Sequence, residues 1–293
     1  FLDCARLGFL GGSEGDAHVG KWHRQVSMLS FEKIEAFREK GADVDFGAFG
    51  ENLVVEGFDL SKVPVGTKFQ IGEAILELTQ IGKECHSHCA IYKVMGDCIM
   101  PREGVFTRVL KGGEIKAGDE ITMLPLEKDR PFTAAIITFS DKGAAGERED
   151  KSGPLIQEML MKEGYDVIET LLLPDGEQPL KHQLMRLADQ RQVNVIFTTG
   201  GTGFAERDVT PEATQAVCDR MAMGIADAIR QYSLSITGRA MLSRAVSGIR
   251  KKTLIVNLPG SPKAVKESLE YVLPHLGHGL GILRGTDGEC GNS

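Results

Sequence analysis

The stretch TTGGTGFAERDVTPEAT, residues 198–214, decides the fold of the second half of the chain. It follows VNVIF, residues 193–197, a run rich in β-branched and aromatic side chains. Together the two runs predict a buried strand, 193–199, that stops abruptly at glycines. Beyond the glycines, Thr210 suits the N-cap of a helix and Pro211 suits its first turn. The predicted unit is therefore a strand, a tight loop and a helix.

The glycine-rich loop itself predicts a site for an anion. Gly200, Gly201 and Gly203 let backbone N–H groups approach a ligand with no Cβ in the way, and such nests bind phosphate. Arg207 and Asp208 add a cation and a carboxylate at the mouth of the loop. The same glycines also suit a tight strand-to-helix connection without a ligand, and the local pattern leaves both interpretations open. Neither the P-loop spacing nor the dinucleotide fingerprint is present.

The composition is that of a soluble globular protein. The 293 residues are enough for about two domains, and 42% hydrophobic with 26% charged residues is ordinary. A net charge of −7 and only 6% aromatic residues argue against nucleic acid as the main partner. No apolar run approaches the ~20 residues of a membrane span, and no signal peptide is evident. Six cysteines in a chain of this length favour free thiols, and hence a cytoplasmic location.

A short charged segment divides the chain. PLEKDRP, residues 125–131, is bracketed by prolines, which predicts an N-terminal domain over 1–126 and a C-terminal domain over 131–293. Before this segment, short β-like runs separated by glycines predict a β-rich barrel or sandwich, with one amphipathic helix from Phe31 to Lys40. The predicted strands are 52–55, 68–71, 74–78, 104–110 and 119–123.

After the segment, strand and helix patterns alternate, which predicts a mostly parallel sheet covered by helices. The predicted strands are 134–139, 167–173, 193–199 and 253–257. The predicted helices begin at Ser152, cover 180–189, and run from Ser261-Pro262 to about Leu273. Ligands of such sheets bind beyond the carboxyl ends of the strands, so we expect the chemistry there.

The residues after the four predicted strands are unusually polar. They are Ser140-Asp141, Asp175, the glycine loop with Asp208, and NLPGS at 257–261. Carboxylates that converge with an anion-binding loop suit Mg²⁺, which takes hard oxygen ligands and shares them with phosphates. A single Asp after a strand is more often a turn or cap residue. Four strand ends of the same character favour a magnesium-assisted phosphate site instead.

These residues closely resemble the molybdopterin adenylyltransferase family of molybdenum cofactor biosynthesis, which includes the G domain of gephyrin. The matching runs are SD at 140–141, DKSGP at 150–154, PDGE at 174–177, TGGTG at 199–203, RDVTPE at 207–212, LSRAVSGIR at 242–250 and NLPGSPK at 257–263. The resemblance covers residues 132–285. It implies a three-layer α/β domain, commonly trimeric, that transfers AMP from Mg-ATP to the terminal phosphate of molybdopterin and releases pyrophosphate.

The resemblance also implies roles for individual residues. Asp208 and Asp175 match catalytic or metal-linked acidic positions of the family. The expected binding residues are Ser140, Asp141, Ser152, the phosphate-cradle residues Gly200, Gly201, Thr202 and Gly203, and the pterin-holding residues Pro259, Gly260 and Ser261. Asp227 stands where relatives usually carry Glu, so the charge is kept with a shorter reach. No covalent protein nucleophile is needed, because positioning, Mg²⁺ and N–H donors supply most of the catalysis.

The first half resembles the MOSC domain, a β-rich module associated with the molybdenum cofactor and with sulfur handling. The matching runs are EGDAH at 14–18, WHRQ at 22–25, FGENL at 49–53 and GKECHSHC at 82–89. The resemblance covers roughly residues 8–124, and the first strand of the domain is expected to be missing. It implies that Cys85 is a sulfur or cofactor ligand.

The cysteines around Cys85 allow other interpretations. The set Cys85, His86, His88 and Cys89 resembles a zinc site, but four ligands within five residues cannot readily surround one ion as a tetrahedron. A structural pair of buried thiols is also open. A reactive thiolate needs a lowered pKa, which Lys83 and the two histidines could supply.

The sequence therefore predicts a fusion protein of molybdenum cofactor synthesis. The C-terminal domain is expected to adenylylate molybdopterin, and the N-terminal domain to bind the pterin or the finished cofactor. The expected partners are ATP, molybdopterin, further copies of the chain in a homotrimer, and a separate molybdate-insertion protein. Two alternatives remain: a non-catalytic cofactor carrier, and a nucleotide-pyrophosphate hydrolase with the same α/β core.

Overall fold

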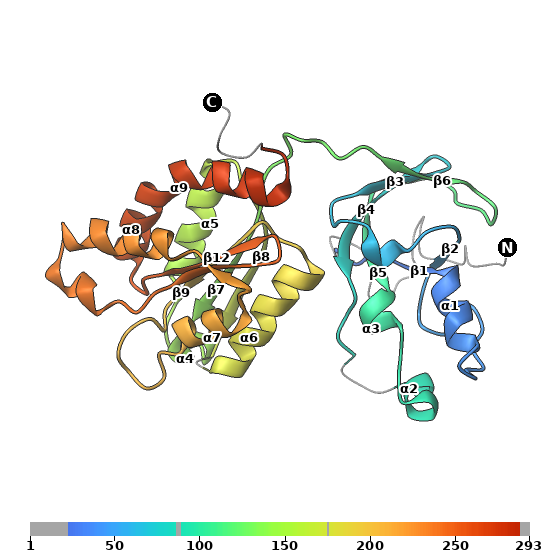
Figure 1. Ribbon diagram of the computed structural model, residues 1–293, viewed down its shortest axis with the longest axis horizontal. Helices are drawn as coiled ribbons and strands as arrows, with labels where there is room; N and C mark the ends of the chain where they lie inside the picture. Colours follow the sequence, from blue (N-terminus) through green and yellow to red (C-terminus); the bar gives the residue numbers. More distant parts are fainter. Residues whose placement is uncertain (1–22, 86–88, 175, 288–293) are drawn as a thin grey trace. The chain divides into compact units, whose positions relative to one another are not determined.

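The chain divides into two units between Glu127 and Lys128, and each unit contains its own six-stranded sheet (Figure 1). The computed structural model describes residues 23–85, 89–174 and 176–287. No helix within these residues is long and apolar enough to cross a bilayer.

The first unit is a curled, mixed sheet. Its strands are β1 Val26–Ser30, β2 Leu53–Val55, β3 Lys68–Ile71, β4 Ala74–Ile81, β5 Val105–Lys111 and β6 Ile121–Leu124. The order is β2-β1-β5-β4-β3-β6, in which only β1 and β2 run parallel. One apolar cluster contains side chains from all six strands, so the sheet wraps around its own core. The prediction of a β-rich domain is confirmed, and among the described residues β2 and β6 are the two edges of the sheet.

Short helices cover the other face of this sheet. They are α1 Phe31–Arg38, α2 Ala90–Met95 and α3 Met100–Glu103, with a 3-10 turn, η1, at Leu60–Lys62. A second apolar cluster joins Ile34 and Phe37 of α1 to Leu29 and Phe106 of the sheet. Strand β1 was not predicted, because two of its five residues are serines. Both serines are buried with partners: Ser27 Oγ donates to Gly50 O at 2.7 Å, and Ser30 Oγ accepts from Leu60 N at 3.0 Å.

The second unit has a mostly parallel sheet, as predicted. Its strands are β7 Thr133–Phe139, β8 Asp166–Leu173, β9 Val195–Thr199, β10 Arg220–Met221, β11 Ser247–Arg250 and β12 Thr253–Leu258. The order is β10-β11-β12-β9-β7-β8, and the four strands from β12 to β8 are parallel. Parallel strands are covered on both faces, which explains why β7 and β9 are buried along almost their whole length.

Helices form a layer on each face of this sheet (Figure 1). One layer holds α5 Ser152–Lys162, α8 Met223–Leu234 and α9 Pro262–Arg284, and the other holds α6 Glu177–Met185 and α7 Thr210–Val217. The remaining elements are α4 Asp141–Ala144, the π-helical turn η2 Arg186–Gln190 and the 3-10 turn η3 Gly238–Leu242. Successive side chains of β7 point to opposite layers, with Ile136 in one cluster and Ile137 in the other.

Two helix boundaries differ from the prediction. Helix α9 does not end near Leu273 but continues through Pro274 to Arg284. A proline inside a helix costs about 3 kcal/mol, but Leu276 and Leu280 extend the buried apolar stripe beyond it and offset that cost. Thr210 is the first residue of α7 and not its N-cap. Its Oγ1 donates to Gly200 O at 2.9 Å instead.

An ion pair joins the turn η2, which follows α6, to the end of β11. Arg250 of β11 donates from Nε and Nη2 to the Asp189 carboxylate at 2.9 and 2.5 Å, and Lys251 Nζ lies 3.1 Å from Asp189 Oδ1. Burial raises the pKa of Asp189, but hydrogen bonds from Arg250 and Lys251 outweigh it and leave the pKa below its ordinary 3.8. The charged form of Asp189 is therefore the one that stabilises the fold.

We expect Asp189→Asn to lower the free energy of unfolding by about 1–3 kcal/mol at neutral pH, because the hydrogen bonds to a charged group are lost. A folded pKa below the unfolded one stabilises the protein fully above 3.8, and this stabilisation is lost as the pH falls through the lower folded value. Urea unfolding should therefore show a smaller difference from wild type at about pH 3 than at about pH 7. Glu270→Gln, in the exposed pair with Lys266, should change stability by less than about 0.5 kcal/mol. If Asp189→Asn and wild type differ in free energy of unfolding by the same amount at both pH values, the charged form of Asp189 is not the one that stabilises the fold.

Candidate functional site

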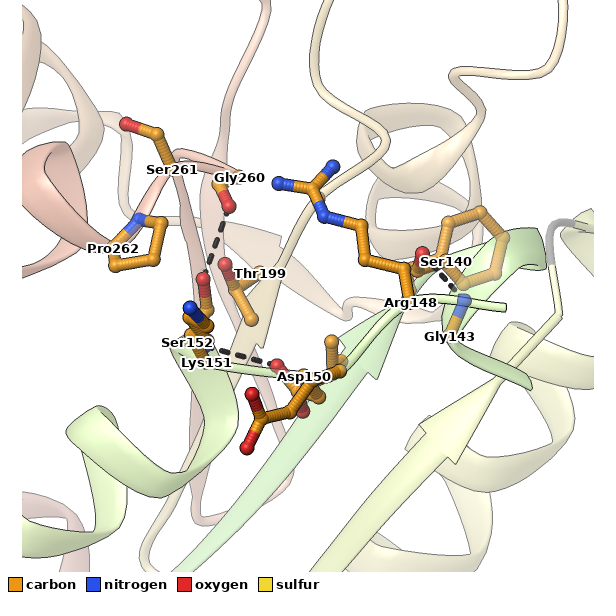
Figure 2. Close-up of a pocket in the computed structure, with 14 residues that line it drawn as sticks. Ser140, Gly143, Arg148, Asp150, Lys151, Ser152, Thr199, Gly260, Ser261 and Pro262 are labelled. Carbon is orange, nitrogen blue, oxygen red and sulfur yellow. Dashed lines mark hydrogen bonds between the residues drawn. The ribbon is translucent and has the colours of Figure 1, made fainter. Parts of the chain in front are cut away.

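A pocket of about 610 Å³ lies at the carboxyl ends of three parallel strands. The ends of β7 and β9, the segment after β12 and the start of α5 supply its walls (Figure 2). The lining residues are Thr138, Phe139, Ser140, Gly143, Arg148, Glu149, Asp150, Lys151, Ser152, Thr199, Gly200, Gly260, Ser261 and Pro262. The site therefore lies where the sheet topology predicts a ligand.

Two helices begin at this pocket, and each is capped by a side chain. Asp150 Oδ1 accepts from the backbone N–H groups of Ser152 and Gly153 at 2.9 and 3.0 Å at the start of α5. Ser261 Oγ accepts from Ala264 N at 3.3 Å at the start of α9. The two starts are joined by the Ser152 hydroxyl, which donates to Gly260 O at 3.0 Å (Figure 2). Helix N-termini carry partial positive charge, so this wall favours an anion.

The glycine loop needs its glycines for the backbone path. Gly200 and Gly201 have φ values of +95° and +65°, which side chains with a Cβ rarely adopt. A Cβ on Gly200 would also collide with Phe139 O, and one on Gly201 would collide with Thr210 Oγ1. A strand-to-helix connection this tight therefore requires both glycines, whether or not a ligand binds.

The same loop leaves backbone donors unused. The N–H groups of Gly201, Thr202 and Gly203 donate no hydrogen bond to any residue that the structure describes. Neighbouring unused donors in a loop are the requirement for an anion nest. The loop geometry is therefore consistent both with an anion site and with a tight strand-to-helix connection that binds no ligand. Of the four residues from 200 to 203, only Gly200 lines the pocket itself.

Arg244 holds the loop in place. Its Nε donates to Gly203 O at 2.6 Å, its Nη2 donates to Asp208 O, and its Nη1 pairs with the Glu212 carboxylate. Its backbone N–H donates to Thr202 O at 3.0 Å. A single side chain thus fixes both ends of the segment that precedes α7. Sequence reasoning missed this role, because Arg244 is 36 residues from Asp208 and the contacts are made to backbone oxygens.

The structure places the predicted site residues in three groups. Those that line the pocket are Ser140, Ser152, Gly200, Gly260 and Ser261. A second group is close in sequence to lining residues but does not line the pocket: Asp141, Gly201, Thr202, Gly203, Asp208 and Pro259. Asp141 is the first residue of α4, and the Pro259 carbonyl accepts from Thr199 Oγ1 at 2.6 Å. Asp227 lies on α8, 61% exposed, in an ion pair with Arg230, and Asp175 lies outside the described residues.

The charged residues 148–151 were not among the predicted binding residues, although Asp150 and Lys151 begin the run DKSGP that carries the family resemblance. All four line the pocket, together with Thr138 and Thr199. A signal was present in the sequence, since this run follows directly on a short glycine-containing loop after β7. An unstructured charged run is usually a solvated surface, however, so the pattern alone did not distinguish it.

The donor set near the pocket fits a magnesium ion shared with a substrate. Asp208 Oδ2 accepts from Ala205 N at 2.9 Å, and its Oδ1 accepts no hydrogen bond from the described residues. No cluster of three or more His, Cys, Asp or Glu side chains able to hold a metal occurs in residues 23–85, 89–174 and 176–287. Mg²⁺ commonly takes only one or two protein carboxylates and completes its shell with phosphates and water. A free Oδ1 on Asp208 meets that requirement.

The candidate residues of the first unit are cysteines. Cys85 and Cys89 are exposed, whereas Cys98 is buried, and burial raises the pKa of its thiol. A raised pKa keeps Cys98 protonated and unreactive at neutral pH. His86 and His88, the other members of the zinc interpretation, lie outside the described residues.

Comparison with known proteins identifies both halves. Residues 135–278 match the family described as a probable molybdopterin binding domain, and residues 15–122 match the MOSC domain. Over 153 residues the chain is 39% identical to the molybdopterin adenylyltransferase of Helicobacter pylori, covering 52% of this chain and 87% of that protein. The chain belongs to the molybdopterin adenylyltransferase family. A second member, from Haemophilus influenzae, is 45% identical over 139 residues, which are 47% of this chain and 71% of that protein.

Solved structures of this family share the fold of the second unit. The molybdopterin biosynthesis enzyme MoaB from Thermus thermophilus is 46% identical, with a TM-score of 0.51, and the match covers 53% of this chain and 97% of that one. The molybdopterin biosynthesis Mog protein from Mycobacterium ulcerans is 39% identical, with a TM-score of 0.50, over 52% of this chain and 99% of that one. The second unit therefore shares its three-layer fold with these molybdopterin biosynthesis proteins.

We expect Arg244→Lys to loosen the glycine loop without unfolding the domain, because an ammonium cannot reproduce the fork of a guanidinium that bonds three oxygens. Amide hydrogen exchange should rise at residues 202–208 and stay unchanged in β9. Arg239→Lys, on the exposed turn η3, is the matched control and should leave exchange in the loop unchanged. Unaltered exchange at residues 202–208 in Arg244→Lys contradicts the role of Arg244 in holding the glycine loop in place.

Proposed function

We propose that the second unit transfers AMP from Mg-ATP to the terminal phosphate of molybdopterin and releases pyrophosphate. The pocket at the ends of β7, β9 and β12 carries the proposal, because it combines two helix N-termini with the cations Arg148 and Lys151. The unused N–H groups beside it support a second anion site. Relatives named molybdopterin adenylyltransferase, at 39% and 45% identity, support the choice of substrates.

The proposed reaction joins two anions. A phosphate oxygen of the pterin attacks the α-phosphorus of ATP, and a new P–O bond forms. The bond from that phosphorus to the oxygen bridging the β-phosphate breaks, and its electron pair leaves with pyrophosphate. Charge repulsion between the reactants is the main barrier, so donors that hold both phosphates supply most of the catalysis. The chain therefore needs no nucleophile of its own.

The roles that we propose for individual residues follow this chemistry. The N–H groups of Gly201, Thr202 and Gly203 bind nucleotide phosphate, and Ser261, after Pro259 and Gly260, holds the pterin. Asp208 holds Mg²⁺, together with Asp175. The ion, when bound, neutralises phosphate charge. Further binding residues in the proposal are Ser140, Asp141, Ser152 and Asp227.

For the first unit we propose that Cys85 binds the pterin or finished cofactor, or carries sulfur. The exposure of Cys85 supports this role, because a thiolate ligand or nucleophile must be accessible. We also propose that residues 1–126 and 131–293 act as two domains, that the first domain has the MOSC barrel, and that the protein works in the cytoplasm. A separate protein then inserts molybdate.

We propose a homotrimer formed through the second unit. Exposed large apolar side chains on α8 and the segment after it support self-association: Leu234 at 42%, Ile236 at 43%, Met241 at 66% and Leu242 at 47% exposure. Apolar side chains gathered on a surface often mark an interface.

The first test is adenylyl transfer by the full chain. Wild type with Mg-ATP and molybdopterin should release pyrophosphate and form the AMP adduct, identified by its mass. Asp208→Asn should lower kcat by about 100-fold or more, because the ion loses a charged ligand. Asp166→Asn, at the opposite end of the sheet on β8, is the control and should keep wild-type activity. Tight pterin binding without turnover in wild type makes the protein a carrier, and pyrophosphate or phosphate release without pterin makes it a hydrolase.

A separate experiment tests Cys85. We expect Cys85→Ser to lower the amount of molybdenum cofactor bound by the full chain, measured as pterin per protein after gel filtration, by about tenfold. Cys89→Ser, a change at a nearby thiol that is also exposed, is the control and should bind as wild type. Wild-type cofactor binding by Cys85→Ser excludes the proposed role.

A further inference from the structure

Residues of both edge strands of the first unit's sheet line one groove. Among the described residues β2 and β6 are the edges of this curled sheet, and they are not paired with each other. Leu53 and Val55 of β2 nevertheless share an apolar cluster with Ile121 of β6, so the curl brings both edges to the same core. A groove of about 560 Å³ opens there, lined by all three residues of β2, by Ile121 and by the segment 115–120 before β6.

The edge strands have backbone groups to offer a further strand. A strand in a sheet turns alternate residues toward each of its two sides, so a strand with one neighbour leaves part of its N–H and C=O groups unbonded. The neighbour of β2 is β1, and that of β6 is β3. Outside those two ladders, no backbone N–H of residues 53–55 or 121–124 donates to a described residue. Such an edge is a template to which an extended peptide can add.

The walls of the groove suit apolar side chains. Phe31, Phe46 and Phe58 line it and are half-buried, and the rings of Phe31 and Phe46 stack with their centroids 6.0 Å apart. Ile115 and Ile121 add aliphatic surface. Every second side chain of a strand points to the same face, so alternate side chains of an added peptide would enter the groove. The groove therefore selects a segment with an apolar residue at every second position.

The rim of the groove is acidic. Among the described lining residues, Glu56, Asp119 and Glu120 are the carboxylates and Lys116 is the cation, and all four are exposed. Lys116 Nζ lies 3.4 Å from Oε2 of Glu114, which does not line the groove. Neither Glu56 nor Glu120 forms an ion pair with a residue that the structure describes. Charge complementarity therefore favours a partner with basic side chains between its apolar ones.

We propose that this groove binds an extended segment of another protein, which adds as a strand beside β2 and carries alternating apolar and basic side chains. Three features specify this partner: the edge backbone, the apolar walls and the acidic rim. The proposal is independent of adenylyl transfer, which is assigned to the second unit. Because β2 has three residues, the added strand pairs over a short length, and the contact is a weak and reversible one.

The test uses the full chain and a short capped peptide of alternating lysine and valine. Two matched peptides isolate its features. One carries glutamate in place of lysine, and the other is N-methylated along its backbone, which removes the N–H donors of the ladder. The Kd of each peptide is measured by fluorescence anisotropy for wild type, for the double variant Glu56→Gln with Glu120→Gln, and for Glu39→Gln. Glu39 is the matched control, since it is exposed and lies outside the groove lining.

We expect wild type to bind the lysine peptide, and binding to slow hydrogen exchange at those N–H groups of residues 53–55 that do not face β1. N-methylation should abolish binding. The double variant should bind the lysine peptide about threefold to tenfold more weakly, because each exposed charge pair contributes little. The glutamate peptide should bind wild type more weakly still, and Glu39→Gln should behave as wild type.

Other outcomes overturn the proposal. If the lysine peptide does not bind, or if the N-methylated peptide binds equally well, the edge does not accept a strand from a partner. If the outward N–H groups of residues 53–55 are already protected in the free chain, the groove is occupied by this protein itself. Protection that increases with protein concentration identifies a second copy, and constant protection identifies a segment of the same chain. If the glutamate peptide binds as tightly as the lysine peptide, the partner is not basic.

Discussion

The site depends on one buried amide. Asn257, fully buried in β12, donates from Nδ2 to the hydroxyls of Thr198 and Thr214, both at 2.9 Å, and its Oδ1 accepts from Val246 N at 3.2 Å. These bonds connect β12, β9, α7 and the segment before β11. Buried amides are costly unless satisfied, so each bond fixes the others. The strand end that precedes the glycine loop and the helix that follows it are both attached to Asn257, which sets the distance that the loop must span.

In the pocket, some polar groups are already paired within the protein and others are not. On one side, Asp150 and Ser261 satisfy helix N-termini, so the first turns of α5 and α9 are held without a ligand. On the other side, the N–H groups of Gly201, Thr202 and Gly203 have no partner among the described residues. The protein thus separates groups that build the walls from groups that are left for a ligand. Such preorganisation lowers the cost of binding, because the donors need not leave other partners.

Sequence reasoning predicted the four parallel strands β7, β8, β9 and β12 and the region of the site, because these follow from local patterns, but it missed the antiparallel strands β10 and β11. The run from Val193 to Thr199 indicates a buried strand whatever the rest of the chain does, and polar residues after parallel strands must meet at one edge. The Arg244 contacts reach segments that are distant in sequence, so no local pattern encodes them. Strand β1 was missed because the partners of its buried serines, Gly50 and Leu60 of η1, are distant in sequence.

The bond from the Ser152 hydroxyl to Gly260 O has a consequence for how the protein is made. It joins residues 108 positions apart, so forming it closes a very large loop. Closure over such a separation is entropically costly and slows folding. We therefore expect the pocket to be among the last features to form in the second unit. A ribosome must have released the start of α9 from its exit tunnel before a nascent chain can hold substrate at all.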